Sequence, residues 1–230
     1  MSFASVSFLL FFLVVLLLLL LVQRVLPFAE IKRRIICQGI LLIASYVFYG
    51  WWNMRLCLLL MGITWISFFT AVKKDEKHLR QSRISLLIGV GTPLAVLGIF
   101  KYYDFFVTSF CDVFHLTPGV LNLILPVGIS FYTFQALSYT IDVYTGKIEK
   151  EKSFLQFALY LSFFPQLVAG PIVKASEFLP QLKENRKVTL AGLESGIQIF
   201  VFGMFKKVVL ADNISVFVDE VYRSPQIFGS

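Results

Sequence analysis

Long runs of apolar residues constrain this chain more than any other feature. Fifteen consecutive apolar residues begin at Phe8, within a segment from Phe3 to Val22, and further runs cover Ile35–Trp52, Leu56–Val72 and Ile84–Phe100. A helix that spans a bilayer needs about 20 mostly apolar residues. The whole chain is 57% hydrophobic and 15% charged, whereas soluble domains have about 25% charged residues. The sequence therefore predicts an all-α fold, a polytopic bundle of membrane helices.

The distribution of charge predicts an orientation in the membrane. The net charge is +7, and basic residues gather in two short links, residues 23–34 and 73–83. Short links rich in Lys and Arg remain on the cytoplasmic side of a membrane. Both links fall on that side if the N-terminus is outside and the first four helices alternate in direction. Because the charge follows this pattern, we do not expect nucleic-acid binding.

The cysteines and histidines give no sign of a metal site or a disulfide framework. Cys37, Cys57 and Cys111 are far apart in the sequence, and two of them lie inside apolar runs, where a free cysteine behaves as a small hydrophobic residue. His78 lies in a charged link and His115 in a short mixed one. We expect both histidines to be ordinary solvated or interfacial side chains, because neither has a second ligand nearby.

After Lys101 the pattern becomes less regular. Tyr102–Leu116 mixes aromatic residues with aspartates, which suits a separate amphipathic helix at the membrane interface. Leu121–Tyr144 is long enough to span but contains Gln135 and Asp142. A charge at the centre of a membrane helix costs about 2.5–3.5 kcal/mol. Asp142 is therefore expected either where the helix leaves the bilayer or facing a cavity lined by protein.

The stretch Leu161–Leu182 interrupts its own helical pattern. It contains Pro165, Gly170 and Pro171, and a proline removes a backbone donor and clashes with the preceding helical turn. Non-helical backbone at membrane depth occurs only where it is buried in protein or lines a wet cavity. The pattern indicates a re-entrant or cavity-lining element. The alternative is a plain helix that stops at Ala169.

A final apolar run, Gly196–Asn213, contains Lys206 and Lys207 near its middle. Lysine side chains can extend to a membrane interface, which would place this helix near the surface. Alternatively, one of the two lysines lines a polar tunnel and meets an anionic group such as a phosphate. The residues alone leave both possibilities open.

Several long motifs, in order along the chain, resemble one known family. They are Leu41–Trp52, Gly98–Phe106, Leu125–Ile148, Phe163–Leu182 and Gly203–Asn213. The sequence resembles the membrane-bound O-acyltransferases, in the branch typified by the alginate O-acetylation membrane protein. The resemblance covers nearly the whole chain. It implies a bundle of about a dozen membrane helices with re-entrant segments around a central tunnel.

The resemblance also implies a chemistry and its partners. Members transfer an acyl group, here acetyl, from acyl-coenzyme A to a hydroxyl, and no tightly bound cofactor is implied. In this branch the acetyl group passes across the bacterial cytoplasmic (inner) membrane toward an extracytoplasmic polysaccharide, with help from periplasmic acetyltransferases. Membrane lipid is the further expected partner. The interrupted segment would then line the tunnel.

This chain departs from the family pattern in one respect. Family members have a catalytic histidine in a downstream Trp-His-Gly-like segment, and neither His78 nor His115 has that context. We therefore expect 1–230 to be the N-terminal part of a single acyltransferase domain, inactive alone, with no catalytic residue to assign. The candidate tunnel-lining residues are Gln135, Asp142, Gln166, Gly170, Pro171 and Lys206. For the two glutamines, interhelical hydrogen bonding is an equal alternative. A channel or transporter component and a non-catalytic scaffold are the competing functions.

Overall fold

The fold of the chain is helical throughout the part that the structure describes. The computed structural model describes residues 5–24, 29–74, 77–114, 116, 119, 121, 123–167, 170–184 and 189–223. Every regular element in these residues is a helix, as predicted. The chain divides into two compact units, one formed by residues 14–184 and the other by residues 1–13 and 185–230.

The smaller unit contains the start of α1 (Val6–Arg24) and the C-terminal helices. These are α9 (Leu190–Phe205), the π-helical turn η1 (Lys206–Ala211) and α10 (Asp212–Arg223). The Thr189 hydroxyl begins α9 by accepting a hydrogen bond from the Gly192 N–H. None of the described residues of these three elements is buried.

The larger unit is built on α2 (Glu30–Gly50) and α3 (Met54–Thr70), which match the predicted second and third apolar runs. The Asn53 side chain caps the N-terminus of α3 by accepting a hydrogen bond from the Arg55 N–H. Such a cap satisfies one of the backbone donors that have no partner within the helix. Among the described helices, α1 and α4 are long and apolar enough to cross a membrane, whereas α3 is shorter. The helices agree with the expected membrane character of the chain.

The longest helix is α4 (Leu79–Phe114), with 36 residues. It corrects the expectation of a separate interfacial helix at Tyr102–Leu116, because the helix continues through Lys101 without a break. The physical reason is the absence of a helix breaker, since the next proline after Pro93 is Pro118. At about 1.5 Å per residue α4 is about 54 Å long, well beyond the hydrocarbon thickness of about 30 Å.

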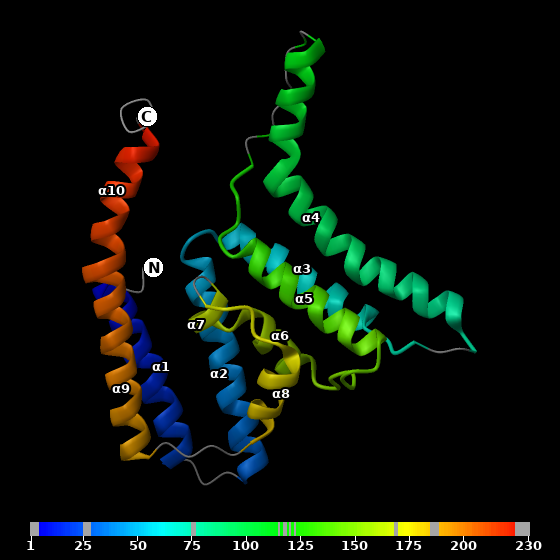
Figure 1. Ribbon diagram of the computed structural model, residues 1–230. Helices are drawn as coiled ribbons and strands as arrows, with labels where there is room; N and C mark the ends of the chain where they lie inside the picture. Colours follow the sequence, from blue (N-terminus) through cyan, green and yellow to red (C-terminus); the bar gives the residue numbers. More distant parts are fainter. Residues whose placement is uncertain are drawn as a thin grey trace. The chain divides into compact units, whose positions relative to one another are not determined.

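The helices α3, α4 and α5 (Ile129–Tyr144) pack side by side around a shared core (Figure 1). A Cβ at Gly89 would lie 2.4 Å from the Thr70 hydroxyl, so this glycine allows a close approach between α4 and α3. Within the described residues, a Cβ at Gly91 or at Gly98 of the same helix would meet open space.

Three short helices follow α5 in the chain. They are α6 (Phe154–Ser162), α7 (Phe164–Leu167) and α8 (Ala175–Lys183). Phe157, Tyr160 and Leu161 of α6 are almost completely buried and belong to the same hydrophobic core as α3 and α5. The interrupted stretch of sequence is therefore part of the packed interior of the larger unit. It is the segment in which the candidate site lies.

Candidate functional site

The segment from α6 to α8 forms a hairpin that returns to the point where it started (Figure 1). Glu151, just before α6, pairs with Lys183 at the end of α8, and their charged atoms are 2.8 Å apart. The helices α6 and α8 have nine residues each, about 14 Å, which is less than half of the hydrocarbon thickness. Arms this short do not reach across the hydrocarbon region. The structure thus agrees with the predicted re-entrant element.

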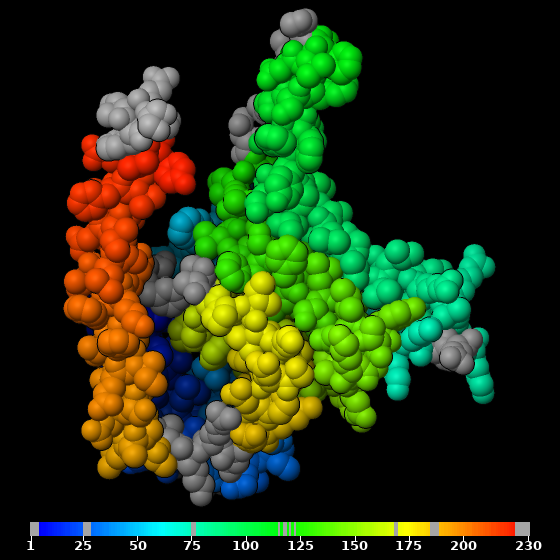
Figure 2. Space-filling view, viewed as in Figure 1, coloured from blue at the N-terminus to red at the C-terminus, as the bar shows by residue number. Residues whose placement is uncertain are grey.

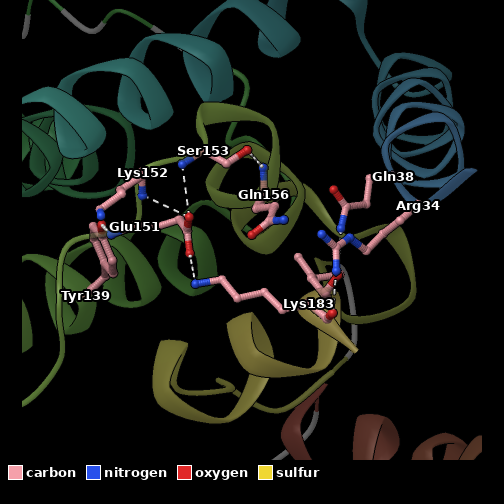
Figure 3. A network of polar contacts seen from close by, with 9 residues as sticks. Arg34, Gln38, Tyr139, Glu151, Lys152, Ser153, Gln156 and Lys183 are labelled. Atoms are coloured by element: carbon pink, nitrogen blue, oxygen red, sulfur yellow. Dashed lines mark hydrogen bonds and ion pairs between the residues drawn. The ribbon is translucent and has the colours of Figure 1, made fainter. Parts of the chain in front are cut away.

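A polar network closes the base of this hairpin (Figure 3). The carboxylate of Glu151 accepts hydrogen bonds from the backbone N–H groups of Lys152 and Ser153, at 2.8 and 2.9 Å. The backbone N–H of Glu151 itself donates to the Tyr139 hydroxyl on α5, at 2.9 Å. Glu151 is only 5% exposed. A buried carboxylate is costly unless it is paired and hydrogen-bonded, and here both conditions are met.

These contacts decide the protonation state of Glu151. Burial alone would raise the pKa of the carboxyl, but the hydrogen bond and charge of Lys183 and the two backbone N–H groups lower it further than burial raises it. The pKa therefore lies below its ordinary value of 4.5. Glu151 is a carboxylate at neutral pH, so it serves as a fixed anion and not as a proton donor.

The C-terminus of α8 is also attached to α2. The Gln38 side-chain amide donates to the Leu182 carbonyl at 2.7 Å, and the Arg34 guanidinium donates to the Lys183 carbonyl at 2.5 Å. The last carbonyls of a helix have no partner within it and carry a partial negative charge. A cation and an amide donor from α2 satisfy both. The hairpin is therefore closed at its base by contacts from three different parts of the unit.

The break between α6 and α7 is compensated by side chains. In an unbroken helix the Phe164 N–H would donate to the Tyr160 carbonyl, four residues before it. Here the Phe164 N–H donates to the Ser45 hydroxyl on α2, at 3.2 Å, and the Tyr160 carbonyl accepts from the Gln166 side chain, at 3.1 Å. Two side-chain hydrogen bonds thus replace one helical bond at the turn before Pro165.

The backbone between α7 and α8 is also held by side-chain hydrogen bonds. The Val173 carbonyl accepts a hydrogen bond from the Tyr160 hydroxyl at 3.0 Å and a longer one from the Gln135 side chain at 3.5 Å. The Gly170 N–H donates to the Gln166 carbonyl at 2.9 Å. A Cβ on Gly170 would lie 2.5 Å from the Gln166 Cα, so a glycine is required there.

A second glycine is required where α5 begins, beside the tip of the hairpin. Gly128 has a φ of 75°, in the left-handed region that L-residues avoid. A Cβ at this position would also lie 2.4 Å from the Leu167 carbonyl oxygen. The positive φ explains why α5 starts at Ile129 and not at the predicted Leu121. The missing side chain lets the start of α5 approach the Leu167 carbonyl at the end of α7.

The structure brings four of the six predicted site residues together around the hairpin. These are Gln135, Gln166, Gly170 and Pro171, which all belong to the hairpin or contact it. The contacts of the two glutamines are hydrogen bonds to backbone carbonyls, which agrees with the structural alternative for these residues. Whether any of the four contacts a substrate stays a prediction.

The other predicted residues lie elsewhere. Asp142 is in the last turn of α5, where its carboxylate pairs with Lys147 at 3.5 Å; its position at the membrane edge or facing a cavity stays a prediction. Lys206 belongs to the smaller unit and lies over the Phe202 ring at 4.5 Å. Its neighbour Lys207 forms an ion pair with Asp212. His78 precedes α4, and His115 lies outside the described residues.

The residues that hold the hairpin in place were not predicted from the sequence. Ser45 looks like an ordinary small residue in an apolar run, and Glu151 looks like one more charge in a solvated link. Both are buried, at 0% and 5% exposure. The one signal in the sequence is that proline and glycine release backbone N–H and C=O groups, which need partners elsewhere in the fold. That reasoning does not say which residues they are.

The comparisons with known proteins decide the family. The profile of MBOAT, the membrane-bound O-acyltransferase family, matches residues 147–227, which include the hairpin. The chain is 38% identical over 189 residues to a "Probable alginate O-acetylase" of Pseudomonas putida, which covers 80% of this chain. It is 37% identical over 206 residues to a peptidoglycan O-acetyltransferase of Helicobacter pylori, which covers 78%. The chain belongs to the membrane-bound O-acyltransferase family.

A further relative shares less of the sequence with this chain. A teichoic acid D-alanyltransferase of Streptococcus thermophilus is 30% identical over 114 residues, which cover 49% of this chain. The chain spans about two fifths of the length of the first two relatives, 39% of each, and 24% of the third. No solved structure matches the chain.

Proposed function

We propose that this chain is part of a membrane O-acyltransferase that moves an acyl group from acyl-coenzyme A to a hydroxyl of an extracytoplasmic polymer. The observation that carries the proposal is the similarity over about four fifths of the chain to proteins named as O-acetylases and O-acetyltransferases. The family profile includes the re-entrant hairpin, which supports a role for this hairpin in the transfer.

The hairpin suits the wall of a path through the membrane. In the transfer, the acceptor oxygen attacks the carbonyl carbon of the thioester, the C–S bond breaks and coenzyme A leaves as the thiol. A path through the membrane for this transfer needs polar backbone at membrane depth. Such backbone is possible only where side chains satisfy the N–H and C=O groups that the helix break releases. Ser45, Tyr160 and Gln166 provide these contacts. We assign them to positioning the hairpin, not to the chemistry.

The proton that leaves the acceptor hydroxyl needs a base within hydrogen-bond reach. Glu151 has a lowered pKa and is engaged at the base of the hairpin, and His78 lies before α4. We therefore propose that the catalytic base, a histidine by the family resemblance, lies outside these 230 residues. The chain alone would then be inactive.

The structure supports the proposed orientation in the bacterial cytoplasmic membrane. The Lys74 N–H donates to the Tyr144 carbonyl, so the basic link after α3 adjoins the end of α5. Glu151, Lys183 and Arg34 meet at the base of the hairpin, close to the start of α2. All these groups belong on one side, and the basic links favour the cytoplasmic side. The N-terminus would then be outside, and the chain would cross the membrane several times.

The names of the relatives guide the choice of donor and acceptor. Two of them are named for acetyl transfer and one for D-alanyl transfer, and their acceptors are alginate, peptidoglycan and teichoic acid. We propose acetyl-coenzyme A as the donor and a polysaccharide hydroxyl as the acceptor, with alginate as the first candidate. A periplasmic acetyltransferase is the proposed intermediary.

The test uses inside-out membrane vesicles from cells that lack the gene and carry a plasmid copy of it. Vesicles are given acetyl-coenzyme A labelled in the acetyl group, and label on material inside the vesicles is counted. We expect label only when the complete gene is expressed, and none with codons 1–230 alone. A channel, transporter or scaffold would leave the thioester intact with the complete gene, and that result would refute the enzyme proposal.

A further inference from the structure

A basic pocket lies where α3 ends and α4 begins, away from the hairpin. It consists of two adjoining cavities of about 220 and 410 Å³ that share His78, Gln81 and Ser85. The cations that line them are Lys73 in one cavity and Lys77 and Arg80 in the other. Nothing in the proposed transfer uses this pocket.

An apolar groove continues from the pocket along α4. Ile84 lines both the larger cavity and a groove of about 450 Å³. This groove is a shallow, open strip on the surface of α4 alone, lined by Ile84, Leu87, Ile88, Gly91, Thr92, Ala95, Val96 and Ile99. Leu87 is 70% exposed and Ile99 48%. In Figure 2 the first turns of α4, in teal, stand clear of α5. From residue 84 to residue 99 the helix rises about 22 Å, more than the depth of one leaflet, which is about 15 Å.

A cationic pocket that opens into an apolar groove is complementary to an amphiphile with an anionic head. The residues from Lys73 to Arg83 include five basic and two acidic side chains. Cationic side chains next to a membrane helix attract anionic lipids, and the hydroxyl of Ser85 is a suitable donor to a phosphate. We propose that this surface binds one anionic phospholipid, with its phosphate in the pocket and one acyl chain along α4.

The groove distinguishes a phospholipid from coenzyme A, the other phosphate-bearing ligand in the system. Both molecules could place a phosphate among the cations. However, the groove presents seven apolar side chains or glycines and a single threonine, so it offers almost nothing to the polar amide chain of coenzyme A. An acyl chain is favoured there because burial of apolar surface is worth about 25 cal/mol per Å².

The proposal is tested by native mass spectrometry on the purified full-length protein after exchange into detergent. The protein is titrated with dioleoyl phosphatidylglycerol and with dioleoyl phosphatidylcholine. We expect one phosphatidylglycerol to bind in preference to phosphatidylcholine. The double variant Lys73→Gln, Arg80→Gln should weaken that binding about ten- to thirtyfold. The matched control is Lys101→Gln, Lys152→Gln, which removes the same charge from exposed lysines outside the pocket, and it should stay within about twofold of the wild type.

A second pair of variants tests the groove without changing charge. A Cβ at Gly91 or at Gly98 meets open space, so leucine fits the helix at both positions, but only Gly91 lines the groove. We expect Gly91→Leu to weaken dioleoyl phosphatidylglycerol and to leave the short-chain dihexanoyl form unchanged. Gly98→Leu should affect neither lipid.

Three results would overturn the proposal. Equal binding of the two dioleoyl lipids would remove the role of the cations. Competition by acetyl-coenzyme A for the bound lipid would assign the pocket to the donor instead. Indifference of lipid binding to both the charge variant and Gly91→Leu would mean that another part of the full-length protein covers this face of α4. The readout is lipid binding, so it does not depend on whether the acyltransferase proposal holds.

Discussion

Replacing Glu151 by glutamine should open the base of the hairpin. The carboxylate accepts three hydrogen bonds, two from backbone N–H groups and one from Lys183. Glutamine keeps the shape but loses the charge and turns an amide group toward the lysine. Hydrogen bonds to a charged group contribute about 1.5–3 kcal/mol and neutral ones about 0.5–1.5. Since Lys183 is 57% exposed, its share is screened and counts for less than about 1 kcal/mol.

Together these terms predict a loss of about 2–4 kcal/mol in the free energy that keeps the hairpin closed. The assay is hydrogen–deuterium exchange with mass spectrometry, read on peptides that cover α8. Because 1.4 kcal/mol corresponds to a factor of ten, exchange there should become faster by about 30-fold or more. Peptides from α3 should change much less, since the Glu151 contacts described above are with α5, α8 and its own link and the hairpin opens locally.

The control variant is Glu149→Gln, which removes the same charge from an exposed position two residues away. It should leave exchange in α8 within about twofold of the wild type. If Glu151→Gln behaves like Glu149→Gln, the Glu151 network does not hold the hairpin, and our account of its base is wrong. A second variant, Lys183→Gln, should give a smaller effect, because the two backbone bonds to the carboxylate remain.

Three further predictions concern the same region. The folded pKa of Glu151 lies below 4.5, so the stability that its ionised carboxylate contributes is complete above about pH 4.5 and is lost as the pH falls through the folded pKa. Hydrogen exchange in α8 of the wild type, corrected for intrinsic rates, should therefore become faster below that pH. A flat profile would contradict the pairing. Ser45→Ala leaves the N–H at the start of α7 without its acceptor and should cost about 1–3 kcal/mol, measured as faster exchange in α7, whereas Ser45→Thr, which keeps the hydroxyl, should lose less. Gly128→Ala combines a left-handed φ with a contact at 2.4 Å and should lower the thermal midpoint of unfolding. The control is Gly146→Ala, where φ is 78° but the new Cβ meets only a flexible lysine side chain, and it should lower the midpoint less. Equal midpoints would show that the close approach of Gly128 to α7 does not require a glycine.

The elements that could be predicted from the sequence are those that depend on local pattern. The apolar runs gave α2 and α3 to within a few residues, because hydrophobic length sets a membrane helix almost alone. The break around Pro165 was predictable for the same local reason, since proline cannot continue a helix without loss. The failure at Lys101 shows the converse. A charge there does not end a helix, because it removes no backbone hydrogen bond.

The contacts that close the hairpin could not be predicted, because they join residues far apart in sequence. Arg34 and Lys183 are separated by 149 positions, and Ser45 and Phe164 by 119. Neither Arg34 nor Ser45 has a local signature that distinguishes it from residues that only face solvent or lipid. Burial of Glu151 was hidden for the same reason, because its neighbours in the chain are charged and exposed. Pairing over such distances is a property of the fold.

The separation between Arg34 and Lys183 also sets an order of events during synthesis. Ribosomes add about 5–20 residues per second, so the guanidinium on α2 is made roughly 7–30 seconds before the carbonyl that it holds, 149 residues later. During that interval α2 is in place while its partner has not yet been translated. We expect a crosslink between cysteines at positions 34 and 183 in arrested nascent chains that are long enough for both positions to have left the ribosomal exit tunnel. Chains whose position 183 is still inside the tunnel should form none. The early helices thus act as a template on which the hairpin is later assembled.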